Sequence, residues 1–287
     1  MEGTKAEKAG GAVTACRVFI SADIEGVAGV VTSLQTLDTA RQYQEGRELM
    51  TEEVNAAIAG AFEGGATEVV VCDSHAAMQN ILPARLDERA VLVRGAMRDS
   101  LQMEGMDASF HAVFITGTHA RAGTPDAVLD HTWNGSMIYN LRINNQTMNE
   151  AELNALVAGR FGVPVTLVTG DESTIEQTRR SLPKAVMVSV KAARGRGVAA
   201  SLHPKESCRR IRQAAAEAVR VRGEIPPFSL PAPLVMEIDY NRTDMAQTAA
   251  LVPDVTRIAP RTVRVEGDPD TIFRLQELLV YRLRYEL

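Results

Sequence analysis

The chain has few cysteines, and their arrangement excludes two classes of protein. Among 287 residues there are three, Cys16, Cys72 and Cys208. They are too few for the disulfide framework of a small secreted domain and too widely spaced for a paired-cysteine metal site. We expect all three to be reduced. Cys72 lies inside an apolar stretch, which favours a small buried hydrophobic residue over a metal ligand.

The chain also lacks an excess of positive charge and long apolar runs. Its 31 Lys and Arg against 36 Asp and Glu give a formal net charge of -5, which disfavours nucleic acid or anionic lipid as a partner. No window reaches the roughly 18 apolar residues of a membrane helix, and the N-terminal stretch lacks the apolar segment of a secretory signal. We therefore expect a cytoplasmic protein that does not associate with membranes, and a flexible tail over residues 1–15.

What the chain does have is the composition and pattern of a folded α/β protein. Hydrophobic residues make up 45% and charged residues 23%, and apolar runs of strand length alternate with amphipathic stretches of helix length. This alternation predicts a mostly parallel, Rossmann-like sheet with flanking helices over residues 16–191. The expected strands are 16–21, 68–72, 90–93, 112–116, 163–168 and 185–190, and the expected helices are 38–63, 150–161 and 172–182.

A smaller α+β domain is expected over residues 192–287. Residues 191–201 are small, basic and rich in glycine, which is typical of a domain boundary or a mobile loop. Before this segment, the pair Asn144-Asn145 predicts a hairpin within residues 139–148, because Asn tolerates the positive φ of a tight turn. The smaller domain is expected to contain helices 204–222, 245–251 and 271–283, and strands 234–240, 256–258 and 263–266.

Carboxylates and histidines gather where three of the predicted strands end. Asp23 and Glu25 follow the first strand, Asp73-Ser74-His75 follows the second, and His119 follows the strand 112–116. In open α/β sheets, ligands bind beyond the carboxyl ends of the strands. Close carboxylates repel one another unless a cation neutralises them, and imidazoles add the nitrogen ligands that transition metals favour. The pattern favours a divalent metal site, with zinc as the leading candidate and manganese or cobalt as alternatives.

Each of these residues also has a structural interpretation. Asp23 and Glu25 are compatible with a turn, and Asp73-Ser74 is compatible with a helix N-cap. Their joint placement at the ends of neighbouring strands leads us to favour the metal site. His111 opens a strand and His203 precedes a predicted helix, so we interpret both as structural residues.

Five motifs together carry a resemblance to a known family. They read SADIEGVAGV, EVVVCDSHAAMQN, ITGTHARAGTP, HTWNGSM and NEAELNALVAGRFGVPVTLVTGD. In this combination the sequence resembles the zinc-dependent D-aminopeptidases, which were once described as dipeptide-transport proteins. The resemblance is strong between about residues 18 and 191 and continues more weakly to the C-terminus.

The resemblance implies two zinc ions in each subunit and a defined set of ligands. The matching positions are Asp23, Glu25, His75, His119 and Glu150. The last of these follows from aligning Leu-Asn-Ala and Val-Ala-Gly of the final motif, which selects Glu150 rather than Glu152. His131 matches the histidine that the family uses as base or nucleophile. Near two metals, such a histidine can take a proton from the attacking water or hold a developing oxyanion.

The resemblance also implies a substrate and an assembly. We expect the release of the N-terminal residue from short D-peptides such as D-Ala-D-Ala, by a water that two zinc ions activate, in a homo-oligomer of two stacked pentameric rings. Asp73 is a candidate for binding the substrate ammonium or for orienting a metal ligand. Two alternatives stay open. One is a hydrolase of the same fold acting on another small amide or a phosphoester, and the other is a non-catalytic peptide-binding protein that accompanies a transporter.

Overall fold

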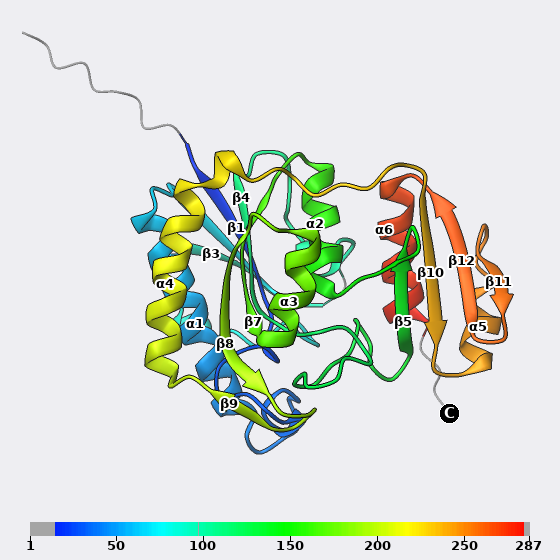
Figure 1. Ribbon diagram of the computed structural model, residues 1–287, viewed down its shortest axis with the longest axis horizontal. Helices are drawn as coiled ribbons and strands as arrows, with labels where there is room; N and C mark the ends of the chain where they lie inside the picture. Colours follow the sequence, from blue (N-terminus) through cyan, green and yellow to red (C-terminus); the bar gives the residue numbers. More distant parts are fainter. Residues whose placement is uncertain (1–14, 97, 284–287) are drawn as a thin grey trace, which may run out of the picture.

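The computed structural model of the chain, shown in Figure 1, describes residues 15–96 and 98–283 and contains two sheets with helices packed on them. Nearly all of the predicted tail, residues 1–14, lies outside the described residues. Within the described part, no helix has both the length and the apolar character needed to cross a bilayer.

The first sheet has seven strands in the order β3-β2-β1-β4-β7-β8-β9. Every neighbouring pair is parallel except β8 and β9, which pair antiparallel. The central strands are buried on both faces, which explains their continuous apolar runs. The strands are β1 (Arg17–Ala22), β2 (Glu68–Asp73), β3 (Ala90–Val93), β4 (Ala112–Thr118), β7 (Val165–Asp171), β8 (Val186–Ala193) and β9 (Ala199–Ser201).

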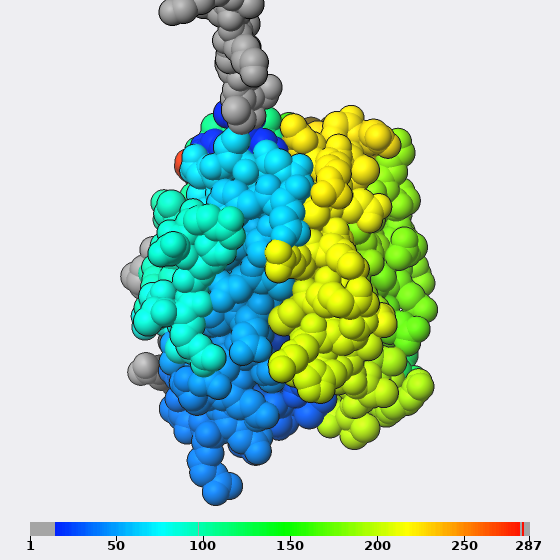
Figure 2. Space-filling view, turned by 90° about the vertical axis from the view of Figure 1, so that its left-hand side faces the viewer, coloured from blue at the N-terminus to red at the C-terminus, as the bar shows by residue number. Residues whose placement is uncertain are grey.

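Four helices cover the two faces of this sheet. On one face, α1 (Tyr43–Glu63) and α4 (Pro204–Arg220) form a core with alternate residues of β1, and Figure 2 shows these two helices side by side. Their backbones approach closely, because a Cβ on Gly60 would lie 2.2 Å from the carbonyl oxygen of Arg212. On the other face lie α2 (Glu150–Arg160) and α3 (Glu172–Ser181).

The second sheet is antiparallel and has five strands in the order β11-β12-β10-β5-β6. Its core also takes residues from α2, α5 (Thr243–Ala249) and α6 (Pro269–Glu277). As predicted, Asn144 and Asn145 form the tight turn between β5 and β6, with φ of 48° and 63°. The strands are β5 (Ile138–Ile143), β6 (Gln146–Thr147), β10 (Leu234–Tyr240), β11 (Thr256–Ala259) and β12 (Thr262–Gly267).

The two sheets are built from interleaved parts of the chain. β5 and β6 come before residue 191 but belong to the second sheet, and α4 comes after it but packs on α1 of the first. The division predicted at residue 191 therefore does not coincide with the division between the sheets. The remaining packing agrees with a mostly parallel α/β sheet followed along the chain by a smaller α+β arrangement, as Figure 1 shows.

Residues 191–201 form a hairpin of strands, whereas the sequence favoured a domain boundary or a mobile loop over a packed element. β8 continues to Ala193, β9 returns beside it as a hairpin, and Lys191 is 3% exposed. The hairpin tip packs on the chain before His131, because Leu129 N–H donates to the carbonyl of Arg196 at 2.9 Å.

The structural interpretations of two histidines are confirmed. Nδ1 of His111 accepts a hydrogen bond from Arg17 N–H at 3.2 Å, and His203 is the N-cap of α4. The three cysteines are free, and Cys72 is fully buried.

Candidate metal centre

The candidate site lies beyond the carboxyl ends of β1, β2 and β4, which are neighbours in the sheet. Two glycines let the ends of β1 and β4 touch. A Cβ on Gly26 would lie 1.9 Å from the carbonyl oxygen of Thr118. One on Gly117, whose φ is +63°, would lie 2.2 Å from the carbonyl oxygen of Asp23. This close approach brings the acidic turn after β1 against the histidine turn after β4.

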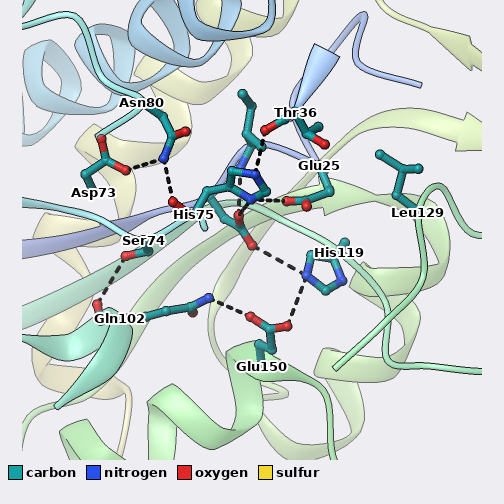
Figure 3. Close-up of polar contacts among 12 residues, drawn as sticks. Glu25, Thr36, Asp73, Ser74, His75, Asn80, Gln102, His119, Leu129 and Glu150 are labelled. Carbon is teal, nitrogen blue, oxygen red and sulfur yellow. Dashed lines mark hydrogen bonds and ion pairs between the residues drawn. The ribbon is translucent and has the colours of Figure 1, made fainter. Parts of the chain in front are cut away.

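Asp23, Glu25 and His75 form one group of potential ligands. Nδ1 of His75 lies 3.3 Å from Oδ1 of Asp23 and 3.1 Å from Oε2 of Glu25. All three side chains are at least nine-tenths buried. Oε2 of Glu25 is buried without a hydrogen-bond partner. Figure 3 shows Glu25 and His75 pointing toward one another.

His119, His131 and Glu150 form the second group. Nε2 of His119 lies 3.2 Å from Oε1 of Glu150 and 3.5 Å from Oδ2 of Asp23, so Asp23 faces both groups with its two oxygens. The ring of His131 stacks on that of His119, with centroids 3.9 Å apart, and its Nε2 lies 3.9 Å from Oε1 of Glu150. The five predicted metal ligands and His131 therefore lie together.

Backbone carbonyls determine which nitrogen of each histidine faces the centre. The outward nitrogens, Nε2 of His75 and Nδ1 of His119 and of His131, lie 2.9 Å, 3.0 Å and 2.8 Å from the carbonyl oxygens of Thr36, Ala120 and Leu129. Because a carbonyl can accept but not donate, each outward nitrogen carries the hydrogen. In the neutral ring, the inward nitrogen then presents a lone pair to carboxylates, an arrangement that needs a cation.

Charge at the centre is out of balance without such a cation. Burial and the neighbouring Glu25 charge raise the pKa of Asp23 to about 8. Burial lowers the pKa of His119, but the charges of Glu150 and Asp23 outweigh it and raise that pKa to about 10. Burial and the adjacent His119 charge lower the pKa of His131. Without a metal ion, bound protons would have to balance the charge of these buried groups.

The residues present fit divalent metal ions on two observations. The inward nitrogens of the histidines face carboxylate oxygens, and within the described residues two of these buried atoms, Oε2 of Glu25 and Nε2 of His119, have no hydrogen-bond partner. Mixed imidazole and carboxylate donors are the catalytic ligand set of zinc. Asp23 belongs to the first group, and its Oδ2 also lies 3.5 Å from Nε2 of His119 in the second, so the two candidate groups are adjacent.

Asp73 does not point into the centre. Its Oδ1 accepts from Nδ2 of Asn80 and its Oδ2 from Ile81 N–H, both at 2.7 Å. The same Asn80 amide donates to the carbonyl of His75 at 2.7 Å, and Figure 3 shows this chain of contacts. Asp73 is fully buried and supports the turn that carries His75, a placement that suits orienting a ligand rather than binding a substrate ammonium.

Two buried residues that the sequence analysis missed also support the ligands. Nζ of Lys191 donates to the carbonyls of Glu25, Val27 and Val30 at 2.5, 2.9 and 2.6 Å. Gln102 donates from Nε2 to Oε2 of Glu150 at 2.5 Å. Neither residue belongs to a recognisable pattern. Lys191 lies within a segment whose composition predicted a loop, and Gln102 lies in the short helix η3 (Leu101–Met103).

Comparisons with known proteins point to one family. Residues 16–277 match the peptidase M55 family, whose description is D-aminopeptidase. A D-aminopeptidase of Bacillus subtilis (strain 168) is 34% identical over 268 residues, which cover 92% of this chain and 96% of the relative. A solved structure of the zinc-dependent D-aminopeptidase DppA from Bacillus subtilis, a self-compartmentalizing protease, superposes with a TM-score of 0.90 at 29% identity. It covers 94% of this chain and all of that one.

Proposed function

Because the chain belongs to the peptidase M55 family of D-aminopeptidases and is a zinc-dependent metallopeptidase, we propose that it releases the N-terminal residue of short D-peptides such as D-Ala-D-Ala with two zinc ions per subunit. The observation that carries the two-ion proposal is Asp23, whose two oxygens face His75 and His119 in different ligand groups. The stereochemistry of the substrate rests on family membership.

The ligand assignment follows from which atoms face inward. Asp23, Glu25 and His75 would hold one ion, and Asp23, His119 and Glu150 the other. His131 is the remaining inward histidine. Its side chain is 19% exposed, more than those of the other five, and its Nε2 is 3.9 Å from Glu150, so we assign it to catalysis rather than to ligation.

His131 is suited to act as the general base. Two bound ions would polarise the scissile carbonyl and lower the pKa of the attacking water toward about 7. The bond from Nδ1 of His131 to the carbonyl of Leu129 fixes the ring so that Nε2 is free to accept a proton from that water. Burial lowers the pKa of His131, which favours the neutral ring that can accept a proton. After accepting the proton, Nε2 can pass it to the leaving amine.

The experiment combines metal analysis with assays on two enantiomers. The purified protein is expected to contain about two zinc ions per chain, to lose turnover on chelation and to regain it with zinc. D-Ala-D-Ala is expected to be hydrolysed and L-Ala-L-Ala left intact. Reconstitution with manganese or cobalt compares these ions with zinc. Replacing His131 with Gln should lower kcat by about 10²–10⁴-fold and leave the zinc content unchanged.

Several results would contradict this proposal. Equal hydrolysis of the two enantiomers would refute the stereochemistry, and one zinc ion per chain would refute the two-ion arrangement. Turnover of a phosphoester or of another small amide, with D-peptides left intact, would favour the alternative hydrolase. If H131Q hydrolysed D-Ala-D-Ala at the rate of the unmodified protein, His131 would not be the base.

We also propose that the chain forms a homo-oligomer, a decamer of two pentameric rings. The DppA structure is that of a self-compartmentalizing protease. In this chain, large apolar side chains are about half or more exposed on the second sheet and in the turn after α5, where a neighbouring copy could cover them; they include Tyr139, Leu251 and Ile258. The cytoplasmic location expected from the sequence stays a prediction.

A further inference from the structure

We propose that Gln102 and Asn154 are positioning residues that fix the Glu150 carboxylate so that one of its oxygens faces the metal centre. The inference rests on the proposed function, because it concerns Glu150 as a metal ligand. It is based on a chain of two buried amides that ends on the Glu150 oxygen facing away from His119.

The contacts form a continuous line from α2 to the site. Nδ2 of Asn154, one helical turn after Glu150, donates to Oε1 of Gln102 at 2.6 Å. Nε2 of Gln102 then donates to Oε2 of Glu150 at 2.5 Å, as Figure 3 shows. Gln102 is 4% and Asn154 2% exposed, so water does not compete for these bonds. Both amides therefore act inside a medium where hydrogen bonds are strong.

Starting from Glu150, each group in this line determines the orientation of the next amide. An ionised carboxylate accepts hydrogen bonds but cannot donate them, so Gln102 must turn its NH₂ group toward Glu150. Its carbonyl oxygen then faces Asn154, which must in turn present its own NH₂ group. If the Asn154 amide were reversed, its carbonyl oxygen would face Gln102. Gln102 would then turn its NH₂ group toward Asn154 and its oxygen toward the Glu150 carboxylate. The orientation of the Asn154 amide therefore determines whether Gln102 can donate a hydrogen bond to Glu150.

This coupling leaves Glu150 one oxygen for the metal. Its Oε2 is engaged by Gln102, while its Oε1 accepts from Trp133 N–H at 2.7 Å and lies 3.2 Å from Nε2 of His119. The carboxylate is therefore held at both ends, and rotation that would offer both oxygens to one ion would break the Gln102 bond. We infer single-oxygen ligation by Glu150, with the second oxygen fixed by the protein.

Gln102 also joins the two halves of the centre. Its backbone carbonyl accepts from the hydroxyl of Ser21 in β1 at 3.0 Å and from that of Ser74 at 3.2 Å. Ser74 directly precedes His75, and Figure 3 shows it beside Gln102. Gln102, which orients Glu150, is therefore hydrogen-bonded to the turn that carries His75, a residue of the other group.

The test measures zinc affinity in apo-protein by titration against a competing chelator. Asn154→Leu touches no ligand, yet it is expected to weaken the binding of one of the two zinc ions, the one that Glu150 would hold, about 10–100-fold, the range for residues that orient metal ligands. Gln102→Leu should weaken it at least as much. In the double variant, the Asn154 change should add nothing, because both act through one bond. We expect kcat to fall while KM changes little.

A second variant distinguishes positioning from structural support. Gln102→Glu keeps the shape and can still accept from Asn154, but at mildly alkaline pH it aims a carboxylate oxygen at Glu150. The added negative charge alone would raise zinc affinity, so positioning predicts a loss of affinity in spite of it, whereas a merely structural role predicts no loss because the shape is kept. Gln276→Leu is the matched control, since Gln276 is a buried amide of α6, and it should keep the zinc affinity of the unmodified protein.

The outcomes separate this inference from the proposed function. If the unmodified protein bound no zinc, the proposed function would fail. If it bound about two ions per chain and Asn154→Leu bound both with unchanged affinity, the positioning inference alone would fail. Additive losses in the double variant, or a lower melting temperature of the apo-protein with unchanged zinc affinity, would likewise overturn it.

Discussion

At the scale of single residues, the first turn of α2 shows how two neighbouring glutamates acquire different roles. Glu150 turns inward to His119, whereas Glu152 turns back to cap its own helix. Oε2 of Glu152 accepts from Asn149 N–H at 2.9 Å, and its Oε1 accepts from the hydroxyl of Ser181. This is a capping box, in which the third residue of a helix satisfies the N-cap backbone.

We therefore expect opposite results from two isosteric replacements. Glu150→Gln should lose zinc, because an amide is a much poorer ligand than a carboxylate. Glu152→Gln should keep zinc and unfold at a slightly lower temperature, because a Gln at this position can still cap the helix. Metal analysis and thermal unfolding of both purified variants measure this difference. Zinc loss from the Glu152 variant, or full zinc content in the Glu150 variant, would show that the assignment is reversed.

The sequence allowed most of the candidate site to be predicted, but not the residues that support it. Asp23, His75 and His119 follow apolar strands, and parallel strands bring their carboxyl ends together, so their convergence has a physical basis in the pattern. Glu150 and His131 were found through the family resemblance. Gln102 has no such signal, because its role depends on a contact with Glu150, 48 positions away in the sequence.

At the scale of elements, the turn after β1 is fixed by buried side chains from two other elements. Lys191 of β8 donates to three carbonyls between Glu25 and Val30, and Glu53 of α1 accepts from Ala28 N–H at 3.0 Å. Within the turn itself, Val27 N–H donates to the carbonyl of Ile24 and Val30 N–H to that of Val27, both at 3.2 Å, and the contacts from Lys191 and Glu53 add to these two bonds. They hold the backbone of Glu25 in place from two sides.

Replacing Lys191 with Met should destabilise this turn strongly. Each carbonyl left buried without a donor costs about 1–3 kcal/mol, so we expect a large fall in the free energy of unfolding, measured by urea denaturation of the apo-protein. Zinc content should fall as well, since Glu25 loses its support. The control is Lys184→Met, whose exposed ammonium reaches a single carbonyl at 3.3 Å. Equal stability of the two variants would show that the Lys191 contacts contribute little.

The predicted elements of the first sheet agree with the structure because each strand is an apolar run flanked by turn residues. Helix α1 begins at Tyr43 rather than near residue 38, since residues 36–42 form turns and a carbonyl in this stretch, that of Thr36, accepts from His75. Composition could not predict the hairpin over residues 191–201, because it reflects the flexibility of an isolated segment and not the contacts that the segment makes. In the folded chain, the buried Lys191 donates to three backbone carbonyls.

At the scale of the whole molecule, the proposed assembly has a direct measurement. Light scattering of the purified protein should give ten times the 31.1 kDa of one chain. Replacing the exposed Leu251, which is 79% exposed, with a charged residue should lower that mass if a neighbouring copy covers it, because burying an unpaired charge is unfavourable. The control is a charged replacement of Val91 on β3, which is 56% exposed at the edge of the other sheet. A monomeric mass for the unmodified protein would refute the proposed rings.

The interleaving of the chain also constrains how such a protein can be rebuilt. The hairpin of β5 and β6 enters the second sheet from the middle of the chain, between β4 and α2, while β10, β11 and β12 arrive near its end. No single crossover can exchange one sheet between two homologues and leave the other intact. A chimera that transplants the smaller sheet needs at least three junctions, one on each side of the hairpin and one before β10.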